Sequence, residues 1–242
     1  MKGRSYAWNV RSLSTMSLRE QKTSLRKRVE ESLKKLEPEE VERQSAIITK
    51  HVLQMPAYQN AKSIAIFLSM PGKEVSTGNI VLQAFEDGKS VFVPYLHAGR
   101  EPKSKVMDML QLRNKDDFQS LKPDAWGIPS LSKDSVDQRE NALGGIGVSD
   151  ESTHDQKGVS NLDLMFMPAV AFDRSHRRLG HGKGFYDRYL STYKNAVDSS
   201  EARRKMPYLV GLALHQQMLL PGENIPVDDN DWLVDEVVVA ET

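Results

Sequence analysis

The apolar run Leu162-Asp-Leu-Met-Phe-Met-Pro168 is followed closely by Arg178-Leu-Gly-His-Gly-Lys-Gly-Phe-Tyr-Asp-Arg188. The first stretch continues to Ala171 with little polar alternation, which predicts a strand buried on both faces that runs straight into the glycine-rich turn. The residues from Phe185 to Tyr193 have a helical pattern. The sequence therefore predicts the order strand, glycine loop, helix, and this order favours an α/β fold.

Similar short apolar runs lie on either side of this unit. Helices are expected to begin at Ser17 and near Pro38, the second ending at Pro56, and another helix is expected over 77–85. Strands alternating with helices indicate an α/β protein with a mostly parallel open sheet, three-layered and Rossmann-like, with helices on both faces. Besides 162–171, the expected strands are 64–68, 90–95, 106–112, 209–214 and 234–240.

The glycines at 180, 182 and 184 alternate with His181 and Lys183. Without Cβ atoms at every second position, successive N–H groups can face one concave side, and a following helix adds its own free N–H groups. Lys183 would neutralise an anion bound there, and Asp187 could hold a cation that a polyphosphate brings with it. The spacing matches neither a Walker A loop nor the dinucleotide fingerprint, so it predicts an anion site, most simply for a nucleotide. The alternative is a flexible turn whose charges face water.

The first expected helix carries a second basic feature. Ser17-Leu-Arg-Glu20 is a capping box. Lys22 and Arg26 lie one turn apart, so both point the same way and could clamp one anion. The alternative is a solvated basic face, because several other basic residues share this helix.

Composition limits the classes of partner. The chain has 242 residues, with 33 Lys and Arg against 33 Asp and Glu, so no overall field favours nucleic acid or an acidic membrane. No cysteine is present, which excludes disulfides and thiolate metal sites. The longest apolar stretch, 164–172, is too short to cross a bilayer. We expect small-molecule substrates, no nucleic-acid or membrane partner, and a monomer.

The domain organisation is expected to be simple. Residues 1–16 form an N-terminal extension or a transit peptide, because the first nineteen residues are basic and serine-containing without an acid. The expected location is the cytoplasm, with mitochondrial import if residues 1–19 act as a targeting signal. Residues 17–242 form one domain. Residues 133–160, rich in Gly, Ser, Asp and Glu, are expected to be a flexible, structureless insertion.

The glycine loop resembles the signature of the 5-formyltetrahydrofolate cyclo-ligase (methenyltetrahydrofolate synthetase) family, which reads Arg-Leu-Gly-x-Gly-x-Gly-Tyr-Tyr-Asp. The likeness extends in the family's order from about Ser17 to the C-terminus. The other matching stretches are Lys22-Thr-Ser-Leu25-Arg26, Phe67-Leu68-Ser69-Met70, Glu74-Val-Ser-Thr77, Trp126-Gly-Ile-Pro129, Leu162 to Pro168, and Asp231 to Val237.

The resemblance implies a fold similar to the sugar-phosphate isomerase and coenzyme A transferase-like folds, and an ATP- and Mg²⁺-dependent ring closure of 5-formyltetrahydrofolate. Lys183 and Glu74 are the implied catalytic residues, and Asp187 and Asp231 the implied Mg²⁺ ligands. The implied substrate residues are Leu68, Glu74, His181, Gly182, Lys183, Gly184 and Phe185. The implied ATP residues are Lys22, Arg26, Arg178, Leu179, Gly180, His181, Gly182, Lys183, Gly184, Phe185 and Tyr186.

Two positions depart from the usual family pattern. Phe185 stands where Tyr is more usual, so it keeps an aromatic face without a hydroxyl. His181 stands where Arg is frequent, so any contact with an anion there depends on pH. For two other residues a plainer role stays open. Glu74 could simply favour the dipole of the next helix, and Asp187 could pair with Arg188 or cap its own helix.

Two other functions remain open from the sequence. An anion loop also suits a sugar-phosphate isomerase-like enzyme of similar fold, which would need neither ATP nor Mg²⁺. A catalytically silent folate- or nucleotide-binding relative would bind its ligands without turnover. Dependence of the reaction on ATP would distinguish a cyclo-ligase from the isomerase-like enzyme. Formation of product would distinguish it from the silent relative.

Overall fold

A computed structural model of the protein describes residues 16–149, 161–199 and 205–240. Its centre is a six-stranded sheet in the order β10-β9-β6-β1-β2-β3, parallel throughout except for the edge strand β3, which pairs antiparallel with β2. The strands of this sheet are β1 (Ser63–Ala65), β2 (Ser90–Ala98), β3 (Lys105–Leu112), β6 (Leu164–Met167), β9 (Tyr208–Ala213) and β10 (Glu236–Val239).

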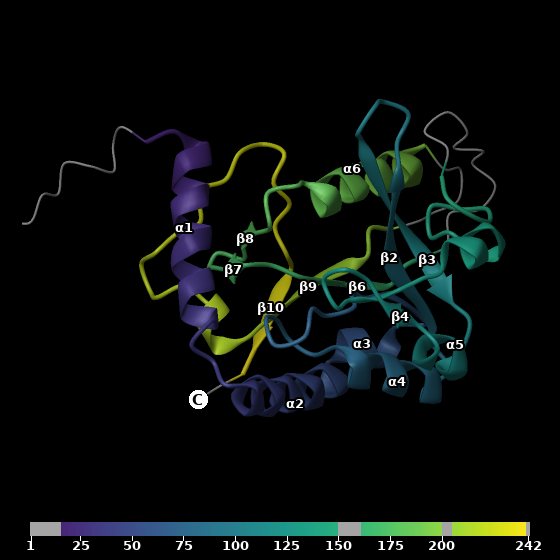
Figure 1. The fold of residues 1–242 in the computed structure, drawn as a ribbon, viewed down its shortest axis with the longest axis horizontal. Helices are drawn as coiled ribbons and strands as arrows, with labels where there is room; N and C mark the ends of the chain where they lie inside the picture. The colour runs from purple at the N-terminus through teal and green to yellow at the C-terminus, as the bar shows by residue number, and fades with distance from the viewer. Residues whose placement is uncertain (1–15, 150–160, 200–204, 241–242) are drawn as a thin grey trace, which may run out of the picture.

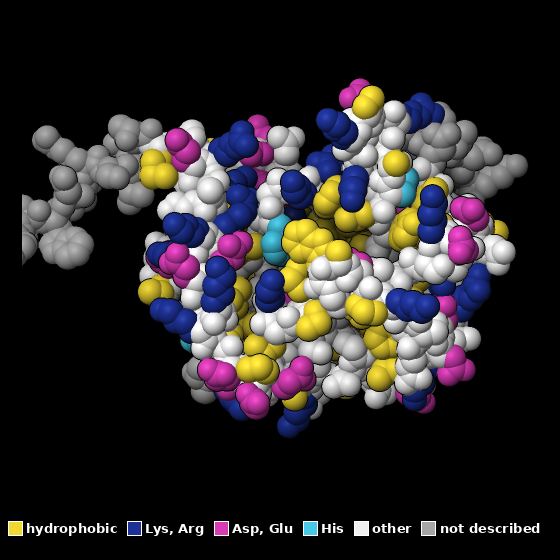
Figure 2. Space-filling view, in the orientation of Figure 1, with side chains coloured by type: hydrophobic (Ala, Val, Ile, Leu, Met, Phe, Trp, Pro, Cys, Tyr) yellow, Lys and Arg dark blue, Asp and Glu magenta, His cyan; other side chains and the backbone are white. Residues whose placement is uncertain are grey.

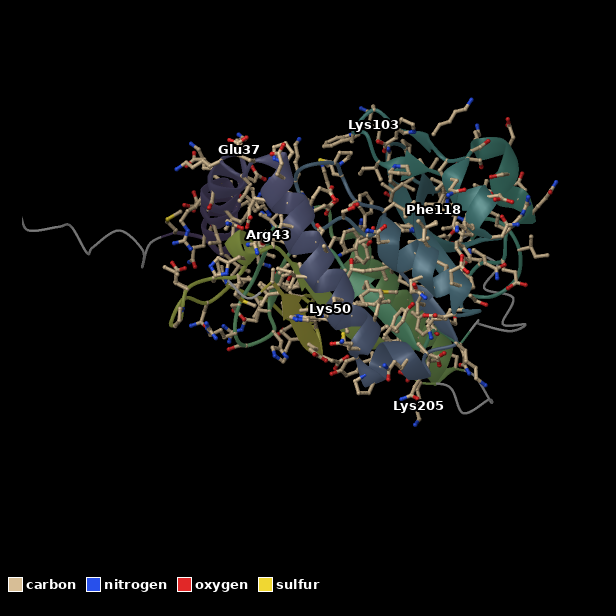
Figure 3. All side chains as sticks on the ribbon, turned by 90° about the horizontal axis from the view of Figure 1, so that it is seen from below. Glu37, Arg43, Lys50, Lys103, Phe118 and Lys205 are labelled. Carbon is tan, nitrogen blue, oxygen red and sulfur yellow. The ribbon has the colours of Figure 1, made fainter. Side chains whose placement is uncertain are left out.

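Helices cover both faces of this sheet, as expected for a three-layered α/β fold (Figure 1). One face packs on α2 (Pro38–Gln54), α3 (Pro56–Asn60) and α4 (Gly78–Glu86), and the other on α6 (Phe185–Asp198). Seen from below, α2 runs across the front of the molecule, with Glu37, Arg43 and Lys50 along it (Figure 3). The predicted fold class is confirmed.

Strand β6 is buried on both faces, as its apolar run predicts. Phe166 belongs to the core under α2, whereas Met165 and Met167 belong to the core under α6. The strand is shorter than expected, because Pro168 has no N–H for the ladder. Residues 171–172 form β7 (Ala171–Phe172), which pairs antiparallel with β8 (Arg178–Leu179). The expectation that one strand runs directly into the glycine loop is therefore corrected: a short hairpin comes between them.

Helix α1 (Leu18–Leu33) begins with the predicted capping box. The Ser17 N–H donates to the Glu20 carboxylate over 2.8 Å, and the Glu20 N–H donates back to Ser17 Oγ over 3.3 Å. Val29 is the helix's one fully buried residue, and it lies over a small apolar cluster shared with the β7–β8 hairpin. This packing stands α1 beside that hairpin (Figure 1), where its basic residues reach the glycine loop.

Two boundaries differ from the sequence expectation. Pro56 follows the end of α2 as predicted, but it also opens the short helix α3, because proline is tolerated at a first helical position. Helix α6 continues to Asp198, whereas the helical pattern is predicted only as far as Tyr193.

The expectation of a structureless insertion over 133–160 is wrong for residues 133–149; residues 150–160 lie outside the described part of the chain. A 3₁₀ helix, η1 (Lys133–Gln138), begins the segment, and Ala142 is fully buried. Buried Arg139 makes two hydrogen bonds, of 2.6 and 2.8 Å, to the Asp117 carboxylate in α5 (Lys115–Gln119). Long-range pairing of this kind leaves little trace in local composition. The two-residue strands β4 (Lys122–Pro123) and β5 (Pro129–Ser130) pair nearby.

We expect Asp117→Asn to lower the free energy of unfolding by about 2 kcal/mol, because it leaves the buried Arg139 charge without its carboxylate. Denaturant unfolding of the purified protein measures this change. Asp116→Asn, at the neighbouring exposed position, is the matched control and should change stability little. Equal stability of the two variants would show that the ion pair does not hold the 133–149 segment.

Candidate functional site

The glycine loop lies at the N-terminus of α6. Gly184 is the N-cap of this helix with φ at 63°, and Gly182 has φ at 83°. Both values lie in the left-handed region, which glycine adopts without strain. No side chain caps the helix, so its first N–H groups are available to a ligand.

Each glycine of the loop also has an arginine packed against it. The sequence predicts free N–H groups at this loop, and the structure adds guanidinium groups beside the positions that lack Cβ atoms. A Cβ would lie 2.9 Å from Arg178 Nη1 at Gly180, 3.2 Å from Arg26 Cζ at Gly182, and 2.9 Å from Arg188 Nη1 at Gly184.

The basic pair of α1, Lys22 and Arg26, lies beside the glycine loop and the Asp231 segment. Arg26 Nε donates to the Gly180 carbonyl over 2.7 Å, which joins α1 to the loop. Lys22 Nζ lies 2.5 Å from an Asp231 oxygen and 3.4 Å from an Asp228 oxygen. Each side chain therefore has its own acceptor, and a joint hold of Lys22 and Arg26 on one anion stays a prediction.

Asp187 pairs with neither of the partners considered from the sequence. Its carboxylate accepts from Arg178 Nη2 over 2.7 Å and from the Trp232 N–H over 3.3 Å. The Arg178 side chain is 4% exposed, so it is enclosed behind the loop. Because Trp232 directly follows Asp231 in the chain, the same contact brings the two implied metal ligands close together.

Glu74 lies in the loop between β1 and α4. One carboxylate oxygen accepts from the Met70 N–H over 2.6 Å. Although part of the side chain reaches solvent, the surrounding protein atoms desolvate it and raise its pKa from 4.5 to about 7. Helix α4 begins only at Gly78, and no acid lies in its first turn. The simple dipole role for Glu74 is therefore not supported.

Tyr186, in the first turn of α6, packs against the apolar core directly after the glycine loop. Its ring packs against the apolar cluster that contains Leu68, and the Arg178 guanidinium lies 5.7 Å from the ring centroid. Burial, and next the nearby charge of Glu74, raise the pKa of the Tyr186 hydroxyl. Because β1 and β6 are parallel neighbours, the segments that follow them, with Glu74 and the glycine loop, lie at the same edge of the sheet. On this side, hydrophobic side chains border Lys and Arg side chains in the notch between α1 and the β2–β3 hairpin (Figure 2).

The outer part of the loop faces solvent. Lys183 is exposed, and within the described residues no carboxylate pairs with its amine. Desolvation lowers the pKa of His181, so its ring is mostly neutral near pH 7 and contributes little positive charge. Phe185 lies under the Arg188 guanidinium, 5.3 Å from ring centroid to Cζ.

Sequence reasoning missed the roles of three residues at this site. Asp228 lies near Lys22, which also pairs with Asp231. The Trp232 N–H donates to Asp187. The Arg188 guanidinium lies against Gly184. The acidic run 228–231 could have indicated the role of Asp228 from the sequence. The roles of Trp232 and Arg188 depend on tertiary packing and have no local signal. Trp126, which begins one of the matching stretches, is 70% exposed at the turn between β4 and β5.

A family model matches residues 18–240 and describes the 5-formyltetrahydrofolate cyclo-ligase family. The chain belongs to this family. It is a family of ligases, and the match covers the glycine loop, α1 and the Asp231 region together.

Named relatives agree with the family assignment. A Schizosaccharomyces pombe protein named probable 5-formyltetrahydrofolate cyclo-ligase is 34% identical over 93% of this chain and 97% of that protein. The Mus musculus 5-formyltetrahydrofolate cyclo-ligase is 34% identical over 95% and 98%, respectively. An Arabidopsis thaliana relative named as the mitochondrial cyclo-ligase is 31% identical over 92% of this chain and 75% of that protein.

Two solved structures of similar fold are named as 5,10-methenyltetrahydrofolate synthetases. The Aquifex aeolicus 5,10-methenyltetrahydrofolate synthetase has a TM-score of 0.63 at 24% identity, covering 91% of this chain and 90% of that one. The Mycoplasma pneumoniae synthetase has a TM-score of 0.55 at 17% identity, covering 90% and 97%. At these identities the likeness supports the fold of the cyclo-ligase domain.

Proposed function

We propose that this cyclo-ligase family member converts 5-formyltetrahydrofolate to 5,10-methenyltetrahydrofolate with ATP, releasing ADP and phosphate. Family membership supports the reaction. The observation that supports it most directly in this chain is that Glu74 and the glycine loop follow the neighbouring parallel strands β1 and β6 at one edge of the sheet. An anion-binding loop and a desolvated carboxylate suited to a substrate with N–H groups therefore lie on the same side of the molecule.

The chemistry explains why ATP is needed. A formyl amide is a poor electrophile, and its oxygen leaves badly as hydroxide. When the formyl oxygen attacks the γ-phosphorus, an O–P bond forms and ADP leaves. N10 then attacks the formyl carbon, the C–O bond breaks, phosphate leaves, and N10 gives up its proton. For phosphoryl transfer, the protein mainly aligns the reacting groups and stabilises the charge on the phosphoryl group.

The proposed roles follow from the positions of the residues. Lys183, on the exposed side of the loop, contacts the transferred phosphoryl group, and the N–H groups at the start of α6 stabilise its charge. Glu74, with a pKa of about 7, accepts the hydrogen bond of a substrate N–H and orients N10. Leu68 and Tyr186 form the apolar wall beside it.

The proposed metal site fits Mg²⁺ in its donor set. Within the described residues no group of three or more His, Asp or Glu side chains is arranged so that it could coordinate a metal ion. Mg²⁺ commonly uses one or two carboxylates together with substrate phosphates, and Asp187 and Asp231 are such a pair. When bound, the ion would neutralise charge on the phosphates. Each carboxylate now pairs with a cation, Asp187 with Arg178 and Asp231 with Lys22.

We expect Asp231→Asn to weaken the Mg²⁺ dependence of ATP binding while strengthening Mg²⁺-free binding. The variant loses a metal ligand, but it frees Lys22 from its nearer carboxylate for a phosphate. Calorimetric titration of ATP, with Mg²⁺ and with a chelator, should show the ratio of the two affinities falling about tenfold. Asp229→Asn, in the same acidic run, is the control. An unchanged ratio for Asp231→Asn would argue against Asp231 as a ligand.

A direct assay tests the proposed function. Purified protein is mixed with 5-formyltetrahydrofolate, Mg²⁺ and ATP, and the absorbance of the methenyl product is followed. Absorbance that rises only when ATP is present supports the cyclo-ligase reaction. Tight folate binding without product would indicate a silent relative. Turnover of a sugar phosphate without ATP would indicate an isomerase.

We also propose a cytoplasmic monomer that uses only small-molecule substrates. No helix in the described ranges is both long and apolar enough to span a membrane. Because the Arabidopsis relative is named as mitochondrial, import of this protein into mitochondria is the alternative location. Residues 1–15, where a targeting signal would lie, are outside the described part of the chain. Imaging of fusions that start at Met1 or at Met16 separates the two locations.

A further inference from the structure

The positive groups around the glycine loop differ in how far they are already neutralised. Lys22 pairs with Asp231 and Arg178 pairs with Asp187, whereas Arg26 donates to the neutral Gly180 carbonyl and keeps its charge at the beginning of the loop. Lys183 and Arg188 are the other two cations. Within the described residues neither has a carboxylate partner, and both side chains are exposed at the start of α6.

Arg188 is nevertheless held in one place. Its Nη1 atom lies where a Cβ on Gly184 would come within 2.9 Å, so the guanidinium rests directly against the loop. Its Cζ lies 5.3 Å from the centroid of the Phe185 ring, which it covers. An arginine that stacks on an aromatic ring keeps its N–H donors free for another acceptor. The guanidinium is therefore positioned without its charge being neutralised.

The position of Arg188 along the loop indicates which group it would meet. Arg26 lies against Gly180 and Gly182, at the beginning of the loop. Arg188 lies against Gly184, at its other end, where α6 begins and the ring of Tyr186 packs against the apolar cluster that contains Leu68. In the proposed reaction the folate lies on the Glu74 side. A nucleotide bound along the loop therefore presents its terminal phosphate to the Arg188 end.

We propose that Arg188 is a phosphate-binding residue that acts with Lys183 on the terminal phosphoryl group of ATP. This inference rests on the proposed function, and it adds a residue outside the loop 178–186 that the resemblance assigns to ATP. The guanidinium supplies N–H donors and a second positive charge at the transferred group. Neither Lys22 nor Arg178 can do so until its own carboxylate is released.

The test compares ATP with ADP, because only ATP carries the terminal phosphate. Titration calorimetry of Arg188→Ala with MgATP and MgADP should show ATP affinity falling about tenfold, with ADP affinity changing less than about twofold. Arg188→Lys keeps the charge and should recover part of the loss. The matched control is Arg43→Ala, on α2 across the sheet (Figure 3), where the arginine pairs with half-buried Glu40.

Other outcomes would overturn the inference in recognisable ways. If Arg188 only supports the loop, ATP and ADP affinities fall together and the melting temperature drops. If it binds the folate instead, ATP affinity is unchanged and the KM for 5-formyltetrahydrofolate rises. Failure of the wild-type protein to bind ATP would refute the proposed function itself. Loss of ATP binding in Lys183→Ala but not in Arg188→Ala would refute this inference alone.

Discussion

Replacing Lys183 with alanine is expected to lower the rate of methenyl product formation by about a thousandfold. The residue is exposed on the loop, without a carboxylate partner among the described residues, so its charge is available to a ligand. Most of the loss should appear in kcat, because the amine contacts charge that develops as the phosphoryl group moves. Initial rates at saturating ATP and folate measure this change.

The loss at Lys183 can be separated from general damage to the protein. An exposed lysine makes few packing contacts, so the melting temperature of Lys183→Ala should match that of the wild type. Lys50→Ala, on α2 across the sheet, is the control for removing one surface lysine (Figure 3). A Lys183→Ala enzyme that retains more than about a tenth of wild-type kcat would remove this residue from the chemistry.

Glu74→Gln is the second change with a large expected effect. We expect kcat/KM for 5-formyltetrahydrofolate to fall about a hundredfold, because glutamine keeps the shape but cannot carry the negative charge that orients a substrate N–H. Glutamine can still accept the Met70 N–H bond, so the loop should stay in place. The affinity for MgATP should be unchanged, which distinguishes this variant from Lys183→Ala.

The same substitution should alter how stability depends on pH. The pKa of Glu74 is about 7 in the folded protein, against its ordinary value of 4.5, so folding disfavours the charged form. At pH 4 the Glu74 carboxyl is mostly protonated in both the folded and the unfolded protein, so its shifted pKa does not lower the stability. As pH rises from 4.5 to 7 the unfolded chain ionises first, so folded-state stability falls and then levels off above 7. Because part of the side chain reaches solvent, we expect a loss on the order of 2 kcal/mol.

Glu74→Gln removes this ionisation, so at pH 8 it should be more stable than the wild type, and the difference should vanish near pH 4. Denaturant unfolding at both pH values measures the effect. Glu37→Gln, an exposed site at the start of α2, should show no such trend. A wild-type-like pH profile in Glu74→Gln would mean that the carboxyl is not desolvated. An unaltered kcat/KM would remove Glu74 from the substrate site.

The local sequence predicted most elements of the fold and the tight backbone of the glycine loop. Four consecutive buried apolar residues specify β6, and Ser17 with Glu20 specify the start of α1, because these signals depend on neighbours in the chain. Two glycines of the loop do adopt positive φ, as a tight anion-binding turn requires.

The tertiary structure alone decided which charges meet. Lys22 is far from Asp231 in sequence, as is Arg139 from Asp117, and no local pattern signals either pairing. Packing also enclosed Glu74 enough to shift its pKa, and it placed Arg188 beside Gly184 with no carboxylate partner among the described residues. The physical reason is the sequence separation over which each kind of interaction acts. Backbone preferences and apolar periodicity act between near neighbours in sequence, whereas ion pairing and desolvation depend on which distant segments the fold brings together.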